Sequence, residues 1–276
     1  MSEAWRNMKP GARFTPVVKL FSTPFLAVAL LGALASAAFA GSYIGTEAAD
    51  ALQGTDEPDQ IYAEGGDDTV TGLGGNDYLE ADAGADMVDG GFGADLLLGG
   101  TGDDRLLAGG GGDVVYAGAD DDEVIGGAGM DHLFGQVGAD RLFGGPDDDR
   151  LYAGSEAEPG ESEFADGGAG DDRITSDGAG TFLGGPGADY IKVTGERATV
   201  DGGPDNDRLR TASDNDEVTG DTGKDKIFTG RGMDVVTADD GERDVINCGK
   251  GRDRVRADRK DDVTGCEVRL GRVVRR

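Results

Sequence analysis

The sequence predicts an all-β fold that winds as a solenoid of nine-residue repeats. Asp recurs at every ninth position twelve times without interruption, from Asp50 to Asp149, and an aliphatic residue stands two positions after each Asp. Glycine supplies 51 of the 276 residues, more than twice its usual share of about 7%. Self-similarity at a fixed period indicates a repeat architecture in which each unit packs on the next. This composition excludes an ordinary helix bundle, because glycine weakens helices.

The repeat unit divides into a turn and a strand. It reads G-G-x-G-x-D-x-U-x, where U is aliphatic, and three units match it in full, at residues 90–98, 99–107 and 126–134. Glycine in the first half of the unit permits tight bends that a Cβ would hinder. In the x-U-x strand, the alternation of side chains places U inward and its two neighbours outward. Two such units per coil would place successive U residues on two facing sheets that share one thin core.

This unit resembles the calcium-binding nonapeptide of RTX (haemolysin-type) proteins, and the resemblance covers most of residues 45–264. It implies a parallel β-roll, a right-handed β-solenoid with two units per coil, in which Ca²⁺ lies between turns stacked on the same side. The residue chemistry agrees, because Ca²⁺ prefers six to eight carboxylate and carbonyl oxygens and no single unit offers that many. Ligands must therefore come from neighbouring turns.

The candidate calcium ligands are the Asp residues at the sixth position of the better-matched units. They are Asp68, Asp77, Asp86, Asp95, Asp104, Asp113, Asp122, Asp131, Asp140, Asp149, Asp172, Asp189, Asp207, Asp225 and Asp234. Asp216 is the weakest of the regular series because its unit lacks the glycines. Asp and Gly are also ordinary turn formers, so a structural or sugar-binding solenoid without metal is the alternative interpretation.

The charge favours several bound ions. The formal net charge of the chain is -29, which makes nucleic acid and acidic membranes improbable partners. Residues 41–276 contain only 44 Leu, Ile, Val and Phe, too few to offset the ordering of so charged a chain. We therefore expect this part of the chain to be largely disordered without calcium and to fold on binding it.

Residues 1–40 are predicted to be a signal peptide. Four basic residues precede an uncharged run at 25–40, which closes with the small-x-small sequence Ala38-Phe39-Ala40. The run falls short of the ~20 residues that a membrane span needs. We expect cleavage before Gly41 and a secreted or extracellular protein with no membrane span.

The repeat becomes irregular after Leu151. The interval from Asp149 to Asp172 is 23 residues, five more than a coil, and predicts an acidic surface loop at 153–166. The unit at 193–201 has Ala198 where Asp belongs, so no full calcium site is expected there.

The calcium-binding roll is expected over residues 41–240, and residues 241–276 form a different segment. It carries eleven basic and seven acidic residues and is interpreted as a basic cap that covers the end of the roll. Cys248 and Cys266 are 18 residues apart, one full coil, and so should stack on neighbouring rungs about 4.8 Å apart, within reach of a disulfide. The final RVVRR is either a solvated tail or a contact with a cell-wall polyanion.

Catalytic residues are not predicted, and the chain is expected not to be an enzyme. His132 is the only histidine, it occupies an outward strand position, and no G-x-S-x-G occurs. An acid/base carboxylate pair stays open, so an extracellular hydrolase or epimerase is the third-ranked function.

The first-ranked function is a secreted calcium-binding protein with a structural or surface-associated role. The second is an adhesin-like interaction protein, or a self-associating one, that uses an outer sheet face. Its basis is a run of apolar ninth positions, which otherwise pack on one another: Leu98, Leu107, Tyr116, Ile125, Phe134, Phe143 and Tyr152.

Overall fold

The structure is a computed structural model that describes residues 41–154 and 162–269. The predicted signal peptide at 1–40 and the final RVVRR lie outside the described residues. Every regular element within the described residues is a β-strand, and they contain no helix long and apolar enough to cross a membrane.

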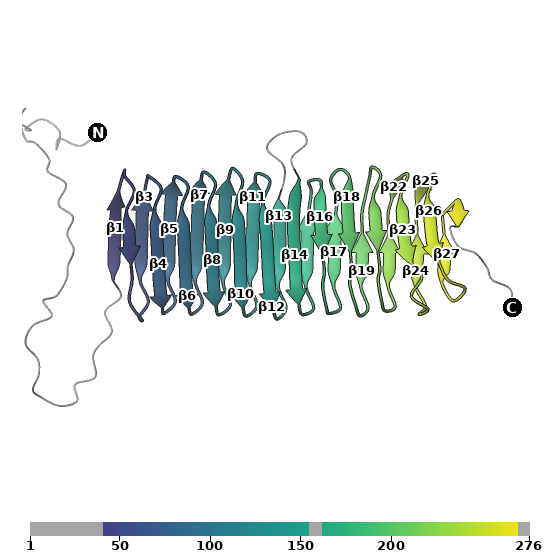
Figure 1. Cartoon of the computed structure of the whole chain (residues 1–276), viewed down its shortest axis with the longest axis horizontal. Helices are drawn as coiled ribbons and strands as arrows, with labels where there is room; N and C mark the ends of the chain where they lie inside the picture. The colour runs from purple at the N-terminus through teal and green to yellow at the C-terminus, as the bar shows by residue number, and fades with distance from the viewer. Residues whose placement is uncertain (1–40, 155–161, 270–276) are drawn as a thin grey trace, which may run out of the picture. The chain divides into compact units, whose positions relative to one another are not determined.

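The strands form two 13-stranded sheets, with alternate strands along the chain assigned to each (Figure 1). The first sheet contains β1 (Ser42–Thr46), β3 (Gln60–Glu64), β5 (Tyr78–Ala83), β7 (Leu96–Thr101), β9 (Val114–Ala119), β11 (His132–Val137), β13 (Arg150–Gly154), β15 (Arg173–Ser176), β17 (Tyr190–Val193), β19 (Arg208–Arg210), β21 (Lys226–Phe228), β24 (Val245–Asn247) and β27 (Asp262–Thr264). The second sheet contains β2 (Ala51–Gln53), β4 (Thr69–Gly74), β6 (Met87–Phe92), β8 (Arg105–Gly110), β10 (Glu123–Ala128), β12 (Arg141–Pro146), β14 (Glu163–Ala169), β16 (Gly180–Leu183), β18 (Ala198–Asp201), β20 (Glu217–Thr219), β23 (Val235–Ala238), β26 (Arg254–Ala257) and β28 (Val268–Arg269). A small additional sheet pairs β22 (Arg231–Gly232) with β25 (Lys250–Gly251).

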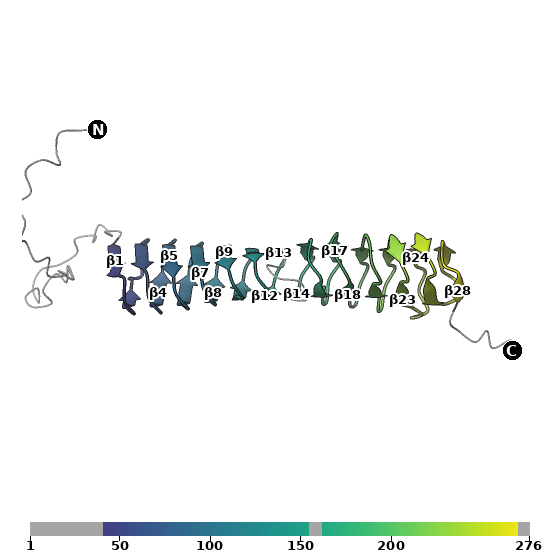
Figure 2. The same cartoon turned by 90° about the horizontal axis from the view of Figure 1, so that it is seen from above.

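Neighbouring strands of one sheet are parallel and lie one coil apart in the sequence. Leu97 of β7 pairs with Leu79 of β5 on one side and with Val115 of β9 on the other, 18 residues away in each direction. Figure 2 shows the two sheets facing each other along the stack. The predicted all-β fold, a parallel β-roll with two nine-residue units per coil, is confirmed.

The core is a single file of U residues from each sheet. From Ile61 to Val255 every U position is at most 1% exposed, and Phe182 has the largest fully buried side chain. Alanines at the first position of several units, such as Ala108 and Ala117, are also fully buried beside them. The core is therefore only a few side chains thick, so apolar burial per residue is small.

The predicted loop at 153–166 is shorter than the sequence suggested. β13 extends to Gly154 and β14 begins at Glu163, and only residues 155–161 of that range lie outside the described residues. Ala165 takes the inward position and pairs with Leu142. The sequence signal was weak because Glu163 stands where the repeat has Asp, and Ala165 stands where it has a larger aliphatic residue.

The apolar ninth positions do not form one continuous stripe. Consecutive units belong to opposite sheets, so Tyr116, Phe134 and Tyr152 share the outer face of the first sheet, whereas Ile125 and Phe143 lie on the second. The rings of Tyr116 and Phe134 stack with centroids 4.7 Å apart, as do those of Phe134 and Tyr152. These side chains therefore pack on one another along one face.

Candidate metal centre

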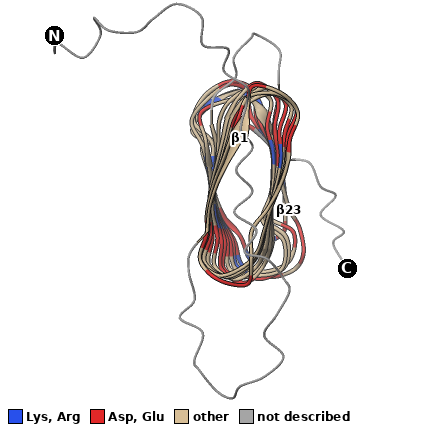
Figure 3. Ribbon diagram, turned by 90° about the vertical axis from the view of Figure 1, so that its left-hand side faces the viewer, with Lys and Arg blue, Asp and Glu red and all other residues tan. Residues whose placement is uncertain are grey.

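Each sheet carries a row of buried carboxylates at the point where the turn enters the strand. Asp95, Asp113 and Asp131 precede successive strands of the first sheet, and Asp86, Asp104 and Asp122 precede those of the second. Seen end-on, Asp and Glu gather in two bands on opposite sides of the ribbon (Figure 3). All fifteen Asp residues predicted as ligands lie in these rows and are at most 3% exposed.

One carboxylate oxygen of each Asp is fixed by the preceding coil. Oδ1 of Asp113 accepts the backbone N–H of Asp95 at 2.7 Å, and Oδ1 of Asp122 accepts that of Asp104 at 2.8 Å. The same bond recurs along both rows. Because Oδ1 is held by the main chain, the rotamer of each carboxylate is set by the coil before it.

The second oxygen, Oδ2, is buried without a hydrogen-bond partner along most of both rows. This holds for all fifteen predicted ligands and for Asp216, Asp244 and Asp253. By contrast, Oδ2 of Asp59 accepts the N–H of Thr55 at 2.6 Å and its hydroxyl at 3.0 Å. An unpartnered buried acceptor costs about 1–3 kcal/mol, and more when it is charged. A repeated series of such atoms indicates that a cation belongs beside them.

Main-chain carbonyl oxygens converge on the same spaces from the next coil. The position that a Cβ would take on Gly90 lies 2.8 Å from Asp95 Oδ2 and 2.5 Å from the carbonyl oxygen of Ala108. The corresponding point on Gly126 lies 2.6 Å from Asp131 Oδ2 and 2.7 Å from the carbonyl oxygen of Gly144. Each carboxylate is thus accompanied by a hard oxygen donor from the neighbouring coil, which is the ligand chemistry that Ca²⁺ prefers.

Burial also perturbs the acidity of the rows. Burial, together with a smaller effect of neighbouring carboxylates, raises the pKa of Asp104 to about 7 and those of Asp122 and Asp207 to about 8. The N–H donated to each Oδ1 opposes this rise in pKa only in part. Without a cation the folded rows therefore hold protons to a higher pH than exposed carboxyls do, and a bound cation would favour the ionised form instead.

The row of the second sheet is interrupted at two coils. Gly180 and Ala198 occupy the Asp position there, and the N–H of Ala198 donates to Oδ1 of Asp216 at 2.9 Å. Ala198 lies at the Asp position that the sequence assigned to it, and the expectation that no full calcium site forms there stays a prediction. The gap at Gly180 was not predicted. Conversely, Glu163 occupies the Asp position of β14, and its Oε2 accepts the N–H of Asp140 at 3.2 Å.

After Ala198, the main-chain carbonyl oxygens beside the second row are no longer all available to a metal ion. Thr211 and Thr229 stand where most earlier units have glycine or alanine, and each hydroxyl donates to the carbonyl oxygen of the next coil, at 2.9 and 3.0 Å. That carbonyl is therefore already engaged beside Asp216 and Asp234. Asp216 was expected to be the weakest candidate, and Asp234 shares the same limitation.

Thr211 and Thr229 belong to a column of first-position residues that stack coil upon coil, and this column ends in a disulfide. Cys248 follows Thr229 one coil later, is fully buried, and is joined to Cys266 with a Cα–Cα separation of 5.2 Å. The pairing matches the one-coil spacing in the sequence. At its C-terminal end, this column is therefore joined by a disulfide rather than by a threonine hydroxyl.

Side chains alone do not assemble a metal site in the described residues. No group of three or more His, Cys, Asp or Glu side chains that could hold a metal occurs among them. This follows from the architecture, because each turn contributes at most one buried carboxylate and the other nearby donors are main-chain carbonyls. A shared site between coils would combine the two kinds of oxygen.

Comparison with known families gives one match. The model described as RTX calcium-binding nonapeptide repeat (4 copies) matches residues 44–79, 65–97, 98–133, 125–157 and 201–236, which together exceed half of the chain. The stretch that it leaves unmatched, 158–200, contains most of the predicted loop at 153–166 and both gaps in the second row. No curated protein sequence matches the chain.

Proposed function

Because the chain belongs to the family of RTX calcium-binding nonapeptide repeats, we propose that the two carboxylate rows hold several Ca²⁺ ions and that this binding drives folding of a secreted protein. Its role is structural or surface-associated. The observation that carries the proposal is the unpartnered Oδ2 in every predicted ligand.

The fifteen predicted Asp residues would each offer Oδ2, and a first-position carbonyl of the next coil would join it at all of them except Asp234, where the Thr229 hydroxyl already engages that carbonyl. Bound Ca²⁺ supplies the positive charge that lets these buried carboxylates stay ionised. The protein itself orients each ligand: Oδ1 keeps its hydrogen bond from the main chain, and this bond fixes the direction of Oδ2. Since the donors come from two coils, binding and winding of the coils are one process.

The proposal favours Ca²⁺ over Mg²⁺. A site made of carbonyls and single carboxylates is adaptable and can supply many oxygens, whereas Mg²⁺ demands tight octahedral geometry and gives up water reluctantly. Affinities of about 10⁻⁴–10⁻³ M are usual for extracellular calcium modules. A protein that folds only after export would need no tighter binding.

Titration of the calcium-free chain with Ca²⁺, followed by far-UV circular dichroism, tests the proposal. We expect a steep rise in β-structure with Ca²⁺ and a poor response to Mg²⁺. Asp104→Asn should weaken the response because it keeps an oxygen for the N–H of Asp86 but loses the charge. Asp103→Asn is the matched control, since the adjacent Asp103 is exposed. Full β-structure in chelator, with melting insensitive to millimolar Ca²⁺, would contradict the proposal.

Export is the second part of the proposal, supported by the basic and apolar pattern of residues 1–40. The mass of the protein recovered from the culture medium should correspond to a chain that begins at Gly41. A full-length protein retained in the cell would count against secretion while leaving calcium binding unaffected.

The chain offers little basis for an enzymatic role in the described residues. The family is a structural calcium-binding repeat, and Nε2 of His132 accepts a hydrogen bond from Nη1 of Arg150 on the outer face. We therefore propose a non-enzymatic protein. Adhesin-like binding through the apolar ninth positions is the weaker alternative, since the rings of Tyr116, Phe134 and Tyr152 stack on one another.

A further inference from the structure

One outer face of this acidic protein is strongly basic. Five successive strands of the first sheet, β13 to β21, present ten outward side chains at their seventh and ninth repeat positions. Six are cations, three are aromatic, one is Thr175 and none is acidic. The six cations are Arg150, Arg173, Lys192, Arg208, Arg210 and Lys226, and all are exposed. We call these ten positions the basic face.

Within the part of the chain that the structure describes, no carboxylate forms an ion pair with the cations of the basic face. The ion pairs among the described residues are Arg105 with Glu123 and Arg256 with Asp239, and neither lies on this face. The guanidinium group of Arg173 instead lies 4.6 Å from the centre of the Tyr190 ring, and that of Arg210 lies 5.7 Å from the Phe228 ring. Aromatic rings thus orient these groups without cancelling their charge.

Like charges stand directly opposite each other on this face. Arg150 pairs in register with Arg173, Lys192 with Arg210, and Arg208 with Lys226. Directly opposed like charges destabilise a sheet. Three such pairs on one face, in a chain with net charge -29, indicate a ligand that offsets the repulsion.

The arrangement of the basic face restricts the chemistry of that ligand. Rungs spaced by about 4.8 Å present a row of cations along a flat surface, which fits an extended polymer with regularly spaced anions. Arg and Lys side chains bind carboxylate and sulfate oxygens by charge-assisted hydrogen bonds. The rings of Tyr152, Tyr190 and Phe228 offer half-buried apolar surfaces between the cations.

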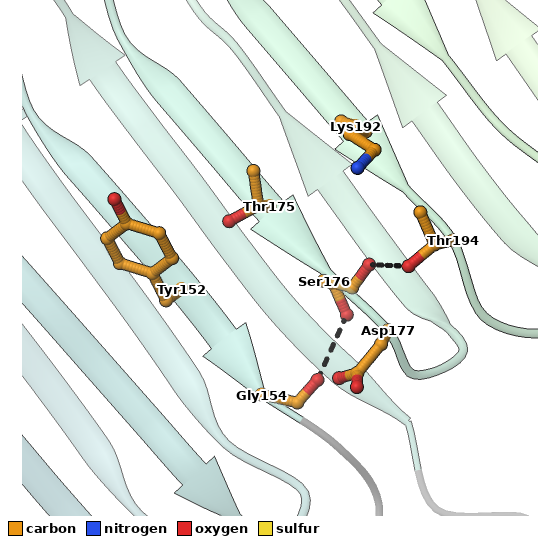
Figure 4. A pocket seen from close by; sticks show the side chains of 7 residues that line it. All are labelled: Tyr152, Gly154, Thr175, Ser176, Asp177, Lys192 and Thr194. Atoms are coloured by element: carbon orange, nitrogen blue, oxygen red, sulfur yellow. Dashed lines mark hydrogen bonds between the residues drawn. The ribbon is translucent and has the colours of Figure 1, made fainter.

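A depression at one end of the basic face favours a sugar over a nucleotide. It has a volume of about 230 Å³ and brings the Thr175 and Thr194 side chains, the Asp177 carboxylate and the Lys192 ammonium group together beside Tyr152 (Figure 4). Thr194 donates through its hydroxyl to the carbonyl oxygen of Ser176 at 3.3 Å. Asp177 can accept hydrogen bonds from the free hydroxyls that each residue of a polysaccharide carries, whereas the deoxyribose within a DNA strand has no free hydroxyl.

We propose that the basic face binds an extended acidic polysaccharide, with carboxylate or sulfate groups along the cation row and the hydroxyls of one sugar in the depression. The site lies on the outer surface, away from the buried carboxylate rows. It requires the folded roll but none of the calcium ligands, so loss of this site and loss of calcium-induced folding are separable.

The test is equilibrium binding of the calcium-loaded full chain to two soluble probes, hyaluronate, which carries carboxylates, and chondroitin sulfate, which carries both anions. Neutral dextran and single-stranded poly(dT) are the comparison probes. We expect salt-sensitive binding to at least one acidic polysaccharide, none to dextran, and weaker binding to poly(dT). Preference for chondroitin sulfate would identify sulfate as the required group, whereas equal binding would identify carboxylate.

The diagnostic variant combines Arg173→Gln, Arg208→Gln and Lys226→Gln. The matched control combines Arg105→Gln, Arg141→Gln and Arg254→Gln, which removes the same charge from the outer face of the second sheet. We expect at least a tenfold loss of affinity for the first variant and less than a threefold loss for the second. Circular dichroism in Ca²⁺ should be the same for both.

Three results would overturn the proposal: no binding of either acidic polysaccharide by the unaltered chain, equal losses in the two triple variants, or tighter binding to poly(dT). If the diagnostic variant folds poorly, Lys192→Gln provides a milder substitution at the depression. It should lower affinity about threefold or more, and an unchanged affinity would equally overturn the proposal.

Discussion

The backbone N–H of Asp113 donates to Oδ1 of Asp131 at 2.8 Å, one coil further on, while Oδ2 of Asp131 is buried without a partner. One carboxylate therefore serves two purposes through two atoms. Oδ1 satisfies a main-chain donor and ties two coils together, and Oδ2 offers a ligand. Substitutions at this residue can separate the two contributions.

Asp131→Asn should keep the bond to Asp113 and abolish the charged ligand, whereas Asp131→Ala removes both. We expect both variants to need more Ca²⁺ to fold, and Ala to be less stable than Asn at saturating Ca²⁺ by about 1–3 kcal/mol, because the Asp113 N–H loses its acceptor. Urea unfolding at high and low Ca²⁺ measures both effects. Equal calcium midpoints for Asn and the unaltered chain would exclude Oδ2 as a ligand.

The ring stack on the first sheet gives a second prediction. Phe134 lies between Tyr116 and Tyr152, with centroids 4.7 Å away on each side. Phe134→Ser should reduce the stability of the calcium-loaded protein by roughly 1–3 kcal/mol, since two aromatic pairs are lost. Sedimentation should remain that of a monomer if packing is the role of the stack.

Phe143→Ser is the companion variant, because Phe143 lies on the outer face of the second sheet and its ring is 5.3 Å from that of Phe164. If the unaltered protein self-associates and only Phe134→Ser abolishes this, the first-sheet stack is an interface and the packing interpretation is wrong.

A third prediction concerns the disulfide between Cys248 and Cys266. The loop of about 18 residues should restrict the unfolded chain enough to contribute roughly 3 kcal/mol. Replacing both residues with Ser should therefore expose the strands from β24 onward to rapid hydrogen exchange, while β7 to β12 stay protected. Two reactive thiols in the unaltered exported protein would disprove the bond.

The sequence alone predicted the fold well wherever the period is unbroken. A single spacing determines both which residues stack and which face inward, so Leu97, Val115 and Asp113 could be placed without coordinates. Glu163, Gly180 and Phe182 could not, because an insertion and a deletion flank them and only strand register relates them to their neighbours. A shifted nonapeptide with Glu in the Asp position was the one signal available.

Two features of the site also required the structure. The column from Thr211 through Thr229 to Cys248 crosses intervals of 18 and 19 residues, so its continuity is hidden in the sequence. The basic face was likewise not apparent, because every second unit belongs to the opposite sheet and Arg173 and Arg208 are separated by acidic turns. Units that follow one another in the sequence lie on opposite sheets, and neighbours within one sheet are a full coil apart in the sequence.

The last prediction is that low pH stabilises the calcium-free fold and so partly substitutes for bound calcium. Burial raises the pKa of Asp104 to about 7 and those of Asp122 and Asp207 to about 8, far above the value of about 3.9 for an exposed Asp. Between about pH 4 and about pH 8, the folded, metal-free protein thus binds more protons than the unfolded chain. Its free energy of unfolding must therefore fall as the pH rises from about 4 to about 8.

We accordingly expect calcium-free protein to contain more β-structure and to melt at a higher temperature at pH 5 than at pH 8. Calcium should reverse this order, since protons compete for the same oxygens: the Ca²⁺ concentration needed for half-maximal folding should be lowest near pH 8 and rise on acidification. Thermal melts after exhaustive dialysis, with and without added Ca²⁺ at both pH values, measure how stability depends on pH in each case. Asp122→Asn should flatten both pH dependences, whereas Asp103→Asn should change them much less, because Asp103 contributes less than burial to the raised pKa values of Asp104 and Asp122. A calcium-free melting temperature that rises from pH 5 to pH 8 would show that the buried carboxylates do not control stability.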